Sequence, residues 1–226
     1  MLLGEGLNVK KLQKVIMDTV PVMAGYLVLG AGFGIVMRSE GYTTMMALCM
    51  SLFIYAGSMQ YAAIGLFGSG AGLLTAGLTA FAVNARHFFY GLSMIEPYKG
   101  AGIRKPYLIF ALTDETYSLV CDGKKDTAYC FLVSLFDHIY WVAGTLFGAL
   151  LGDFLRFNTE GIDFALTALF ITVFTDQWIR NKDHFPALAG VFASVLALIV
   201  FGKDSFLIPA MILIFVCLSG KEAFHD

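Results

Sequence analysis

The sequence predicts an all-α membrane protein, a polytopic bundle of about seven or eight helical spans. Of its 226 residues 58% are hydrophobic and only 14% are charged, and the mean hydropathy is +0.74. A soluble domain of this length could not bury so much apolar surface. Apolar runs of spanning length follow one another without strand-like alternation. Charged and amide residues inside these runs indicate an interior polar pathway, because such residues are costly in lipid.

The N-terminal segment, residues 1–18, is expected to lie on the membrane surface. Its residues 9–18 mix valine, leucine, isoleucine and methionine with Lys10, Lys11 and Lys14, which is typical of a short amphipathic helix. No small-residue cleavage site separates this segment from the first apolar run, so a cleavable signal is not expected. The lysines favour a cytoplasmic start.

The apolar runs predict one transmembrane domain over residues 19–219, followed by a short polar tail at 220–226. The first run is rich in glycine, the third is interrupted by polar residues, and the fourth is short. The predicted spans are 19–37, 43–67, 71–95, 106–121, 127–152 and 162–179, with two shorter runs at 186–201 and 205–219.

Small residues recur at four-residue spacing in two of the runs. Gly30 and Gly34 share one helix face, and so do Gly144 and Gly148. This pattern lets helix backbones approach closely in a membrane. We therefore interpret these glycines as packing residues.

An internal similarity predicts two related repeats. Residues 52–61 read LFIYAGSMQY and residues 169–178 read LFITVFTDQW, so a Leu-Phe-Ile triplet and a Gln-aromatic pair recur at the same spacing. Weaker matches extend the similarity over 19–95 and 138–219, with 106–121 as the connector. Transporters are often built from such halves, with the substrate near the midplane.

The repeat also predicts a pair of discontinuous helices. In the alignment the polar stretch Asn84–His87 falls on Gly202–Ser205, so 71–95 and 186–219 are the expected interrupted segments. A broken helix leaves free backbone groups at its ends. The N-terminus of a half-helix attracts a carboxylate, and its C-terminus attracts an ammonium group.

Three motifs occur in a characteristic order: Ala56–Gln60 (AGSMQ), Asn84–His87 (NARH) and Leu112–Glu115 (LTDE). Together they resemble the AzlC family, also called BrnF or YgaZ, the large subunits of bacterial branched-chain amino acid exporters. The resemblance implies efflux of leucine, isoleucine and valine, with methionine or analogues as further substrates, across the cytoplasmic membrane. It also implies a second, smaller membrane subunit of the AzlD type.

Arg86 and Asn84 are the candidate substrate-binding residues of the third span. The planar guanidinium of Arg86 suits a substrate carboxylate, and the alternative is a structural pair with Asp114 or Glu115. Asn84 would either bind substrate or cap a half-helix. His87 is a candidate proton-relay group, with a satisfied interior histidine as the alternative.

Asp114 and Glu115 are candidates for proton coupling or ion pairing. Because they are adjacent, they point about 100° apart on a helix and cannot both face one site. One is expected to carry protons while the other packs or reaches solvent. Asp137 and His138 form a further candidate relay in the fifth span, and Asp137 is also a candidate counter-charge for Arg86.

Gln60 and Gln177 occupy matching positions in the two predicted repeats. They are candidate hydrogen-bond donors to the substrate from opposite halves. The alternative is an interhelical hydrogen bond.

Three classes of function compete. The first is a secondary exporter of branched-chain amino acids driven by the proton gradient, and the second is a channel or facilitator for another small polar solute. The third is an intramembrane enzyme, and the sequence contains none of the common catalytic motifs that this class would need. A net charge of -2 gives no basic field for nucleic acid. The four cysteines have unrelated spacings, so no metal or other cofactor is expected.

Overall fold

The structure is a computed structural model that describes residues 9–121, 126–154, 171, 174–175, 178–179, 183–202 and 206–223. Every regular element among these residues is a helix, as the sequence predicts. The chain divides into two compact units, Met1–Ile162 and Asp163–Asp226. They are described in turn.

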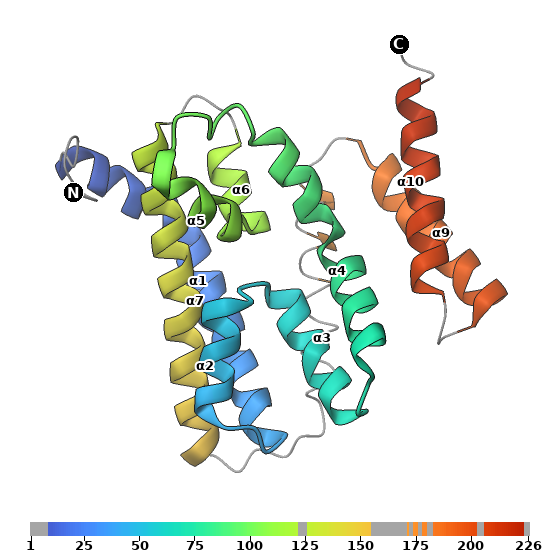
Figure 1. Cartoon of the computed structure of the whole chain (residues 1–226), viewed down its shortest axis with the longest axis horizontal. Helices are drawn as coiled ribbons and strands as arrows, with labels where there is room; N and C mark the ends of the chain where they lie inside the picture. Colours follow the sequence, from blue (N-terminus) through green and yellow to red (C-terminus); the bar gives the residue numbers. More distant parts are fainter. Residues whose placement is uncertain are drawn as a thin grey trace. The chain divides into compact units, whose positions relative to one another are not determined.

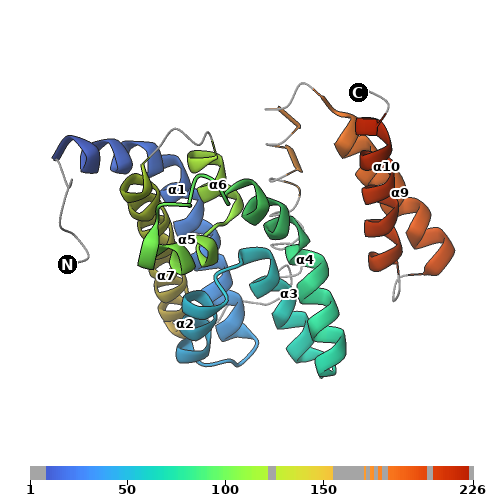
Figure 2. The ribbon, with the colours of Figure 1, turned by 45° about the horizontal axis from the view of Figure 1, so that its top comes forward.

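Two long helices, α1 (Val9–Ser39) and α7 (Thr127–Phe154), lie side by side in the first unit (Figure 1). Both are long and apolar enough to cross a membrane, α7 over Thr127–Gly152. α1 begins in the expected amphipathic segment and continues into the first predicted span. It contains Pro21, and Figure 2 shows its N-terminal turns at an angle to the rest. A proline inside a helix removes a backbone hydrogen bond and bends it.

Glycines bring the backbones of α1 and α7 into direct contact. A Cβ atom at Gly30 would lie 2.8 Å from the carbonyl oxygen of Trp141, and one at Gly144 would lie 2.8 Å from that of Tyr26. A Cβ at Gly148 would collide with the backbone of α1. This confirms the interpretation of the spaced glycines as packing residues.

The second predicted span, 43–67, is two helices. α2 (Thr44–Phe53) and α3 (Gly57–Gly68) are separated by a break at Ile54–Ala56. Within the break Tyr55 has φ +44°, a left-handed conformation that is strained for a bulky residue.

The interruption predicted in the third span is wrong. α4 (Leu73–Ser93) runs through Asn84–His87 without a break. The stretch holds neither glycine nor proline, so its polarity alone does not end the helix. Arg86 instead finds polar partners on neighbouring helices.

The fourth predicted span, 106–121, is also interrupted. A 3₁₀ turn (Gly102–Arg104) leads into α5 (Lys105–Phe110), and α6 (Asp114–Val120) follows after residues 111–113. Thr113 caps α6, since its side chain accepts a hydrogen bond from the backbone N–H of Thr116.

An ion pair connects the start of α7 to α1. Asp126 accepts a hydrogen bond from the backbone N–H of Tyr129 at 2.7 Å, which caps α7. Its other oxygen lies 2.6 Å from the Lys11 ammonium, and that contact holds the pKa of Asp126 below its usual value. The interaction stabilises the fold above the usual aspartate pKa and is lost as the pH falls through the lowered one.

In the second unit α9 (Phe185–Phe201) packs against α10 (Leu207–Ala223). α9 ends at Gly202, which has φ +71°, in agreement with the predicted interruption there. Most of the predicted span 162–179, including Asp176 and Gln177, lies outside the described residues. The repeat and the count of seven or eight spans therefore stay predictions.

Candidate functional site

The two helix breaks of the first unit meet beside Tyr26 of α1. The ring of Tyr55, in the α2–α3 break, lies edge-on at 6.5 Å from the ring of Tyr26. The Tyr26 hydroxyl lies 2.6 Å from Oγ1 of Thr113, in the α5–α6 break. All three residues are buried. The broken helices and α1 thus bring polar groups together inside an apolar bundle.

α7 contributes a buried acid to this region. Asp137 is fully buried, and its Oδ2 accepts a hydrogen bond of 2.8 Å from Thr116. Its Oδ1 is buried without a hydrogen-bond partner among the described residues, as is the hydroxyl of Tyr55. Asp137 does not pair with Arg86, so its predicted role as the counter-charge is wrong.

His138 links three elements around the first break. Its ring stacks at 4.1 Å on Tyr55, Nδ1 lies 3.1 Å from the hydroxyl of Tyr107, and Nε2 lies 3.2 Å from the carbonyl oxygen of Ser51. Asp137 and His138 therefore contact different groups, since neighbours on a helix point in different directions.

Arg86 of α4 pairs with Asp114, the first residue of α6. Their N–O distance is 2.7 Å, and their side chains are 34% and 23% exposed. Arg86 also donates a hydrogen bond of 3.1 Å to the hydroxyl of Ser58, in the first turn of α3. That helix begins without a side-chain cap. The arginine and the helix N-terminus thus present positive charge at one place.

Two atoms of this ion pair and one atom of Asn84 have no hydrogen-bond partner among the described residues. They are Nε of Arg86, Oδ1 of Asp114 and Oδ1 of Asn84, and each is buried. Asn84 does not cap a half-helix, because α4 is continuous there. The pair itself therefore has one free donor and one free acceptor, and unsatisfied buried polar atoms are candidate contacts for a ligand.

Glu115 faces away from this pair, as predicted from its adjacency to Asp114. Its Oε2 accepts a hydrogen bond of 2.8 Å from the hydroxyl of Tyr26. The two acids thus serve different neighbours. His87 is half-buried and lies edge-on to the ring of Tyr90 at 5.9 Å.

Gln60 makes interhelical hydrogen bonds. It is fully buried, accepts from Nε1 of Trp141 at 2.9 Å and donates to Oγ of Ser51 at 3.0 Å. Ser51 in turn lies 2.8 Å from Oγ1 of Thr145. Both ends of the amide are occupied, which supports the alternative weighed for Gln60. The predicted counterpart Gln177 lies outside the described residues.

Four residues of this region were not predicted as site residues: Tyr26, Tyr55, Thr113 and Thr116. Their weak signal is a hydroxyl within an apolar run, which is common in membrane helices and seldom marks a site. Only the packing of the helices shows that these hydroxyls face acids.

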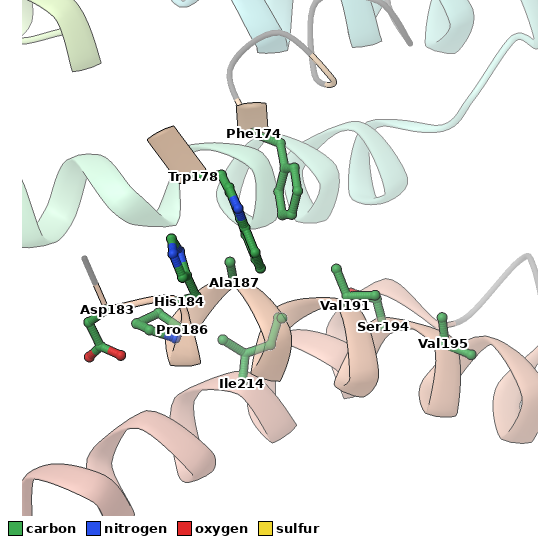
Figure 3. A pocket seen from close by; sticks show the side chains of 11 residues that line it. Phe174, Trp178, Asp183, His184, Pro186, Ala187, Val191, Ser194, Val195 and Ile214 are labelled. Carbon is green, nitrogen blue, oxygen red and sulfur yellow. The ribbon is translucent and has the colours of Figure 1, made fainter. Parts of the chain in front are cut away.

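The second unit has a cavity of its own, of about 920 Å³ (Figure 3). The ring of His184 lines this cavity, stacks on Trp178 at 4.1 Å and has a buried Nδ1 without a partner among the described residues. The other lining residues are mainly apolar. They are Phe174, Asp183, Pro186, Ala187, Gly190, Val191, Ser194, Val195 and Ile214.

The described residues hold no cluster of three or more histidine, cysteine, aspartate or glutamate side chains suited to a metal ion. The first unit therefore offers hydrogen bonds and charge, with one cationic and three acidic side chains in its polar region. Such a set suits a small ligand that carries both charges.

Comparisons with known proteins match the model of the AzlC protein family to residues 21–155. The chain is 43% identical over 201 residues to the branched-chain amino acid transport protein AzlC of Bacillus subtilis, covering 87% of this chain and 79% of that protein. It is 40% identical to an uncharacterized membrane protein of Helicobacter pylori, covering 88% and 90% of the two chains. It is 26% identical to the inner membrane protein YgaZ of Escherichia coli, covering 79% and 78%. No solved structure matches.

Proposed function

The chain belongs to the AzlC family of membrane proteins, and from that premise we propose that it transports branched-chain amino acids. The proposed direction is export across the bacterial cytoplasmic membrane, with the chain crossing the bilayer several times. The name of the Bacillus subtilis relative supports the substrate class. The proposed driving force is the proton gradient. A small membrane subunit of the AzlD type is the proposed partner.

The unsatisfied polar atoms around the Arg86–Asp114 pair carry the proposal. An amino acid zwitterion has one carboxylate, which accepts hydrogen bonds, and one ammonium group, which donates three. Nε of Arg86 is a free donor for the carboxylate, while Oδ1 of Asp114 and Oδ1 of Asn84 are free acceptors for the ammonium. The free donor and the free acceptors thus match the substrate carboxylate and ammonium in sign.

Two further features favour a carboxylate at Arg86. The uncapped N-terminus of α3 begins at Gly57, beside the guanidinium. Transporters bind substrate where discontinuous helices meet, and α2–α3 is such a helix. The substrate carboxylate would either bind Arg86 together with Asp114 or displace Asp114 from Arg86.

Efflux of leucine from dipeptide-fed bacterial cells that lack their own exporters tests this function. The cells carry this chain with and without an AzlD-type subunit. We expect faster efflux that a protonophore abolishes and that Arg86→Ala reduces strongly. Lys99→Ala is the matched control, because that exposed lysine pairs only with Glu96 at 3.5 Å among the contacts described. Efflux that resists the protonophore would support a facilitator, and no efflux of leucine, isoleucine or valine would refute the substrate.

A further inference from the structure

A continuous row of hydrogen-bonding groups joins two acids in the first unit. Oε2 of Glu115 lies 2.8 Å from the Tyr26 hydroxyl, which lies 2.6 Å from Oγ1 of Thr113. Oγ1 of Thr113 lies 3.0 Å from that of Thr116, and Oγ1 of Thr116 lies 2.8 Å from Oδ2 of Asp137. All four distances are in the range of good hydrogen bonds between oxygens.

The number of hydrogens in this row is informative. Four contacts join five groups, and each contact needs one hydrogen between its two oxygens. The three hydroxyl groups supply one hydrogen each, so two ionised acids would leave one contact without any. The backbone N–H of Thr116, which donates to Thr113, fills no contact along the row. One added proton completes it.

We propose that Glu115 and Asp137 share one proton, which moves between them along the hydroxyls of Tyr26, Thr113 and Thr116. With the proton on Glu115, each hydroxyl donates toward Asp137, which is ionised. When each group passes its hydrogen to the next, four O–H bonds break and four form. Asp137 is then protonated, Glu115 is ionised, and every hydroxyl donates toward Glu115.

Burial gives this path a direction. Glu115 is half-buried, whereas Tyr26, Thr113 and Thr116 are buried and Asp137 is fully buried. The row therefore leads from a partly exposed acid to a fully buried one. A single buried acid without such a row could gain a proton only if water reached it directly.

Other charged or titratable groups face both ends of the row. Asp114 lies next to Glu115 on α6, and Arg86 and Tyr90 of α4 lie within electrostatic reach of Glu115. The hydroxyl-bearing rings of Tyr55 and Tyr107 face Asp137 from the first helix break and from α5. Asp114 also carries one of the free acceptors proposed for the substrate ammonium. Substrate bound there would therefore change the electrostatic surroundings of the neighbouring Glu115. This link to transport rests on the proposed function, whereas the shared proton does not.

The proton path is tested on the purified full-length chain by a pH jump followed by infrared spectroscopy, without substrate. The carboxyl band of Asp137, assigned with Asp137→Asn, reports when the buried acid gains its proton. We expect Tyr26→Phe and Thr116→Val to slow this step about a hundredfold. Thr116→Ser keeps the hydroxyl and should keep the rate.

Matched controls remove hydroxyls outside the row. Tyr61→Phe and Thr19→Val each delete a buried hydroxyl that donates to a backbone carbonyl of α1. They should leave the rate unchanged. Unchanged rates in both Tyr26→Phe and Thr116→Val, or an Asp137 band that does not respond to pH in the wild type, would overturn the proposal.

A second measurement connects the path to transport in proteoliposomes. Tyr26→Phe should retain exchange of labelled for unlabelled leucine, which needs no net proton movement, and should lose leucine-driven proton flux. If Tyr26→Phe keeps both leucine exchange and leucine-driven proton flux, a role of this row in coupling is overturned. If the wild type does not move leucine at all, the proposed function fails, while the pH-jump experiment still decides on the shared proton.

Discussion

At the scale of single residues, Arg86 connects an acid to a helix N-terminus. Its guanidinium contacts Asp114 at 2.7 Å and Ser58 at 3.1 Å. Arg86→Ala leaves the Asp114 carboxylate without its partner in a half-buried place. We expect the free energy of unfolding in detergent to fall by about 2 kcal/mol, less than for a fully buried pair.

The double variant Arg86→Ala with Asp114→Ala separates folding from binding. Removing both charges should return most of the lost unfolding free energy, because no unpaired charge remains. Leucine transport should stay absent, since the group proposed to bind the substrate carboxylate is gone. Recovery of transport in the double variant would contradict the binding role of Arg86 and leave it a purely structural residue.

At the scale of elements, the contact between α1 and α7 depends on glycine at chosen positions only. A Cβ at Gly148 would collide with the backbone of Ala31, whereas a Cβ at Gly25, also on a long helix, meets nothing within 4 Å. Gly148→Ala should lower the free energy of unfolding by about 3 kcal/mol, because two backbones would have to separate.

Gly25→Ala is the matched control for that change. It should raise the free energy of unfolding by about 0.5–1 kcal/mol, the helix-propensity gain of alanine over glycine. Thermal unfolding of both variants in detergent checks the pair of values. Equal effects at the two positions would show that propensity rather than backbone contact determines the role of Gly148.

The helix breaks show which features of the elements were predictable. A break was predicted at the polar stretch Asn84–His87. α4 is nevertheless continuous there, because the charge of Arg86 is paired with an acid on another helix. The break before α6 does carry a local signal, a capping Thr113 followed by two acids in the first turn. The break at Ile54–Ala56 carries none, since the left-handed Tyr55 is held by tertiary packing.

The site likewise combines features that have a local sequence signal with features that depend on tertiary packing. The rule that charges within apolar runs find partners gave the pairing of Arg86 with Asp114 or Glu115 as one of two alternatives, and adjacency predicted that Asp114 and Glu115 diverge. The hydroxyls between Glu115 and Asp137 could not be predicted in this way. Which hydroxyl meets which acid depends on which helices are neighbours, and that order is a property of the packed unit.

At the scale of the whole molecule, substrate should stabilise the native state. Three elements meet at the proposed site, since Arg86 of α4 contacts Asp114 of α6 and Ser58 of α3. A ligand that binds only the folded chain adds about 2.7 kcal/mol at a hundred times its Kd. We therefore expect leucine, isoleucine and valine to raise the melting temperature of the detergent-purified chain, alone or with the proposed small subunit.

Two analogues make this prediction specific to a zwitterion. Leucinol keeps the ammonium and the side chain of leucine but lacks the carboxylate, and 4-methylpentanoate keeps the carboxylate but lacks the ammonium. Each leaves one set of the free atoms around Arg86 and Asp114 unsatisfied, so neither should raise the melting temperature as leucine does. Gly25→Ala should retain the effect of leucine, and Arg86→Ala should lose it. Equal stabilisation by leucine and 4-methylpentanoate would mean that only the carboxylate is recognised, which would exclude Asp114 and Asn84 from the binding of the ammonium group.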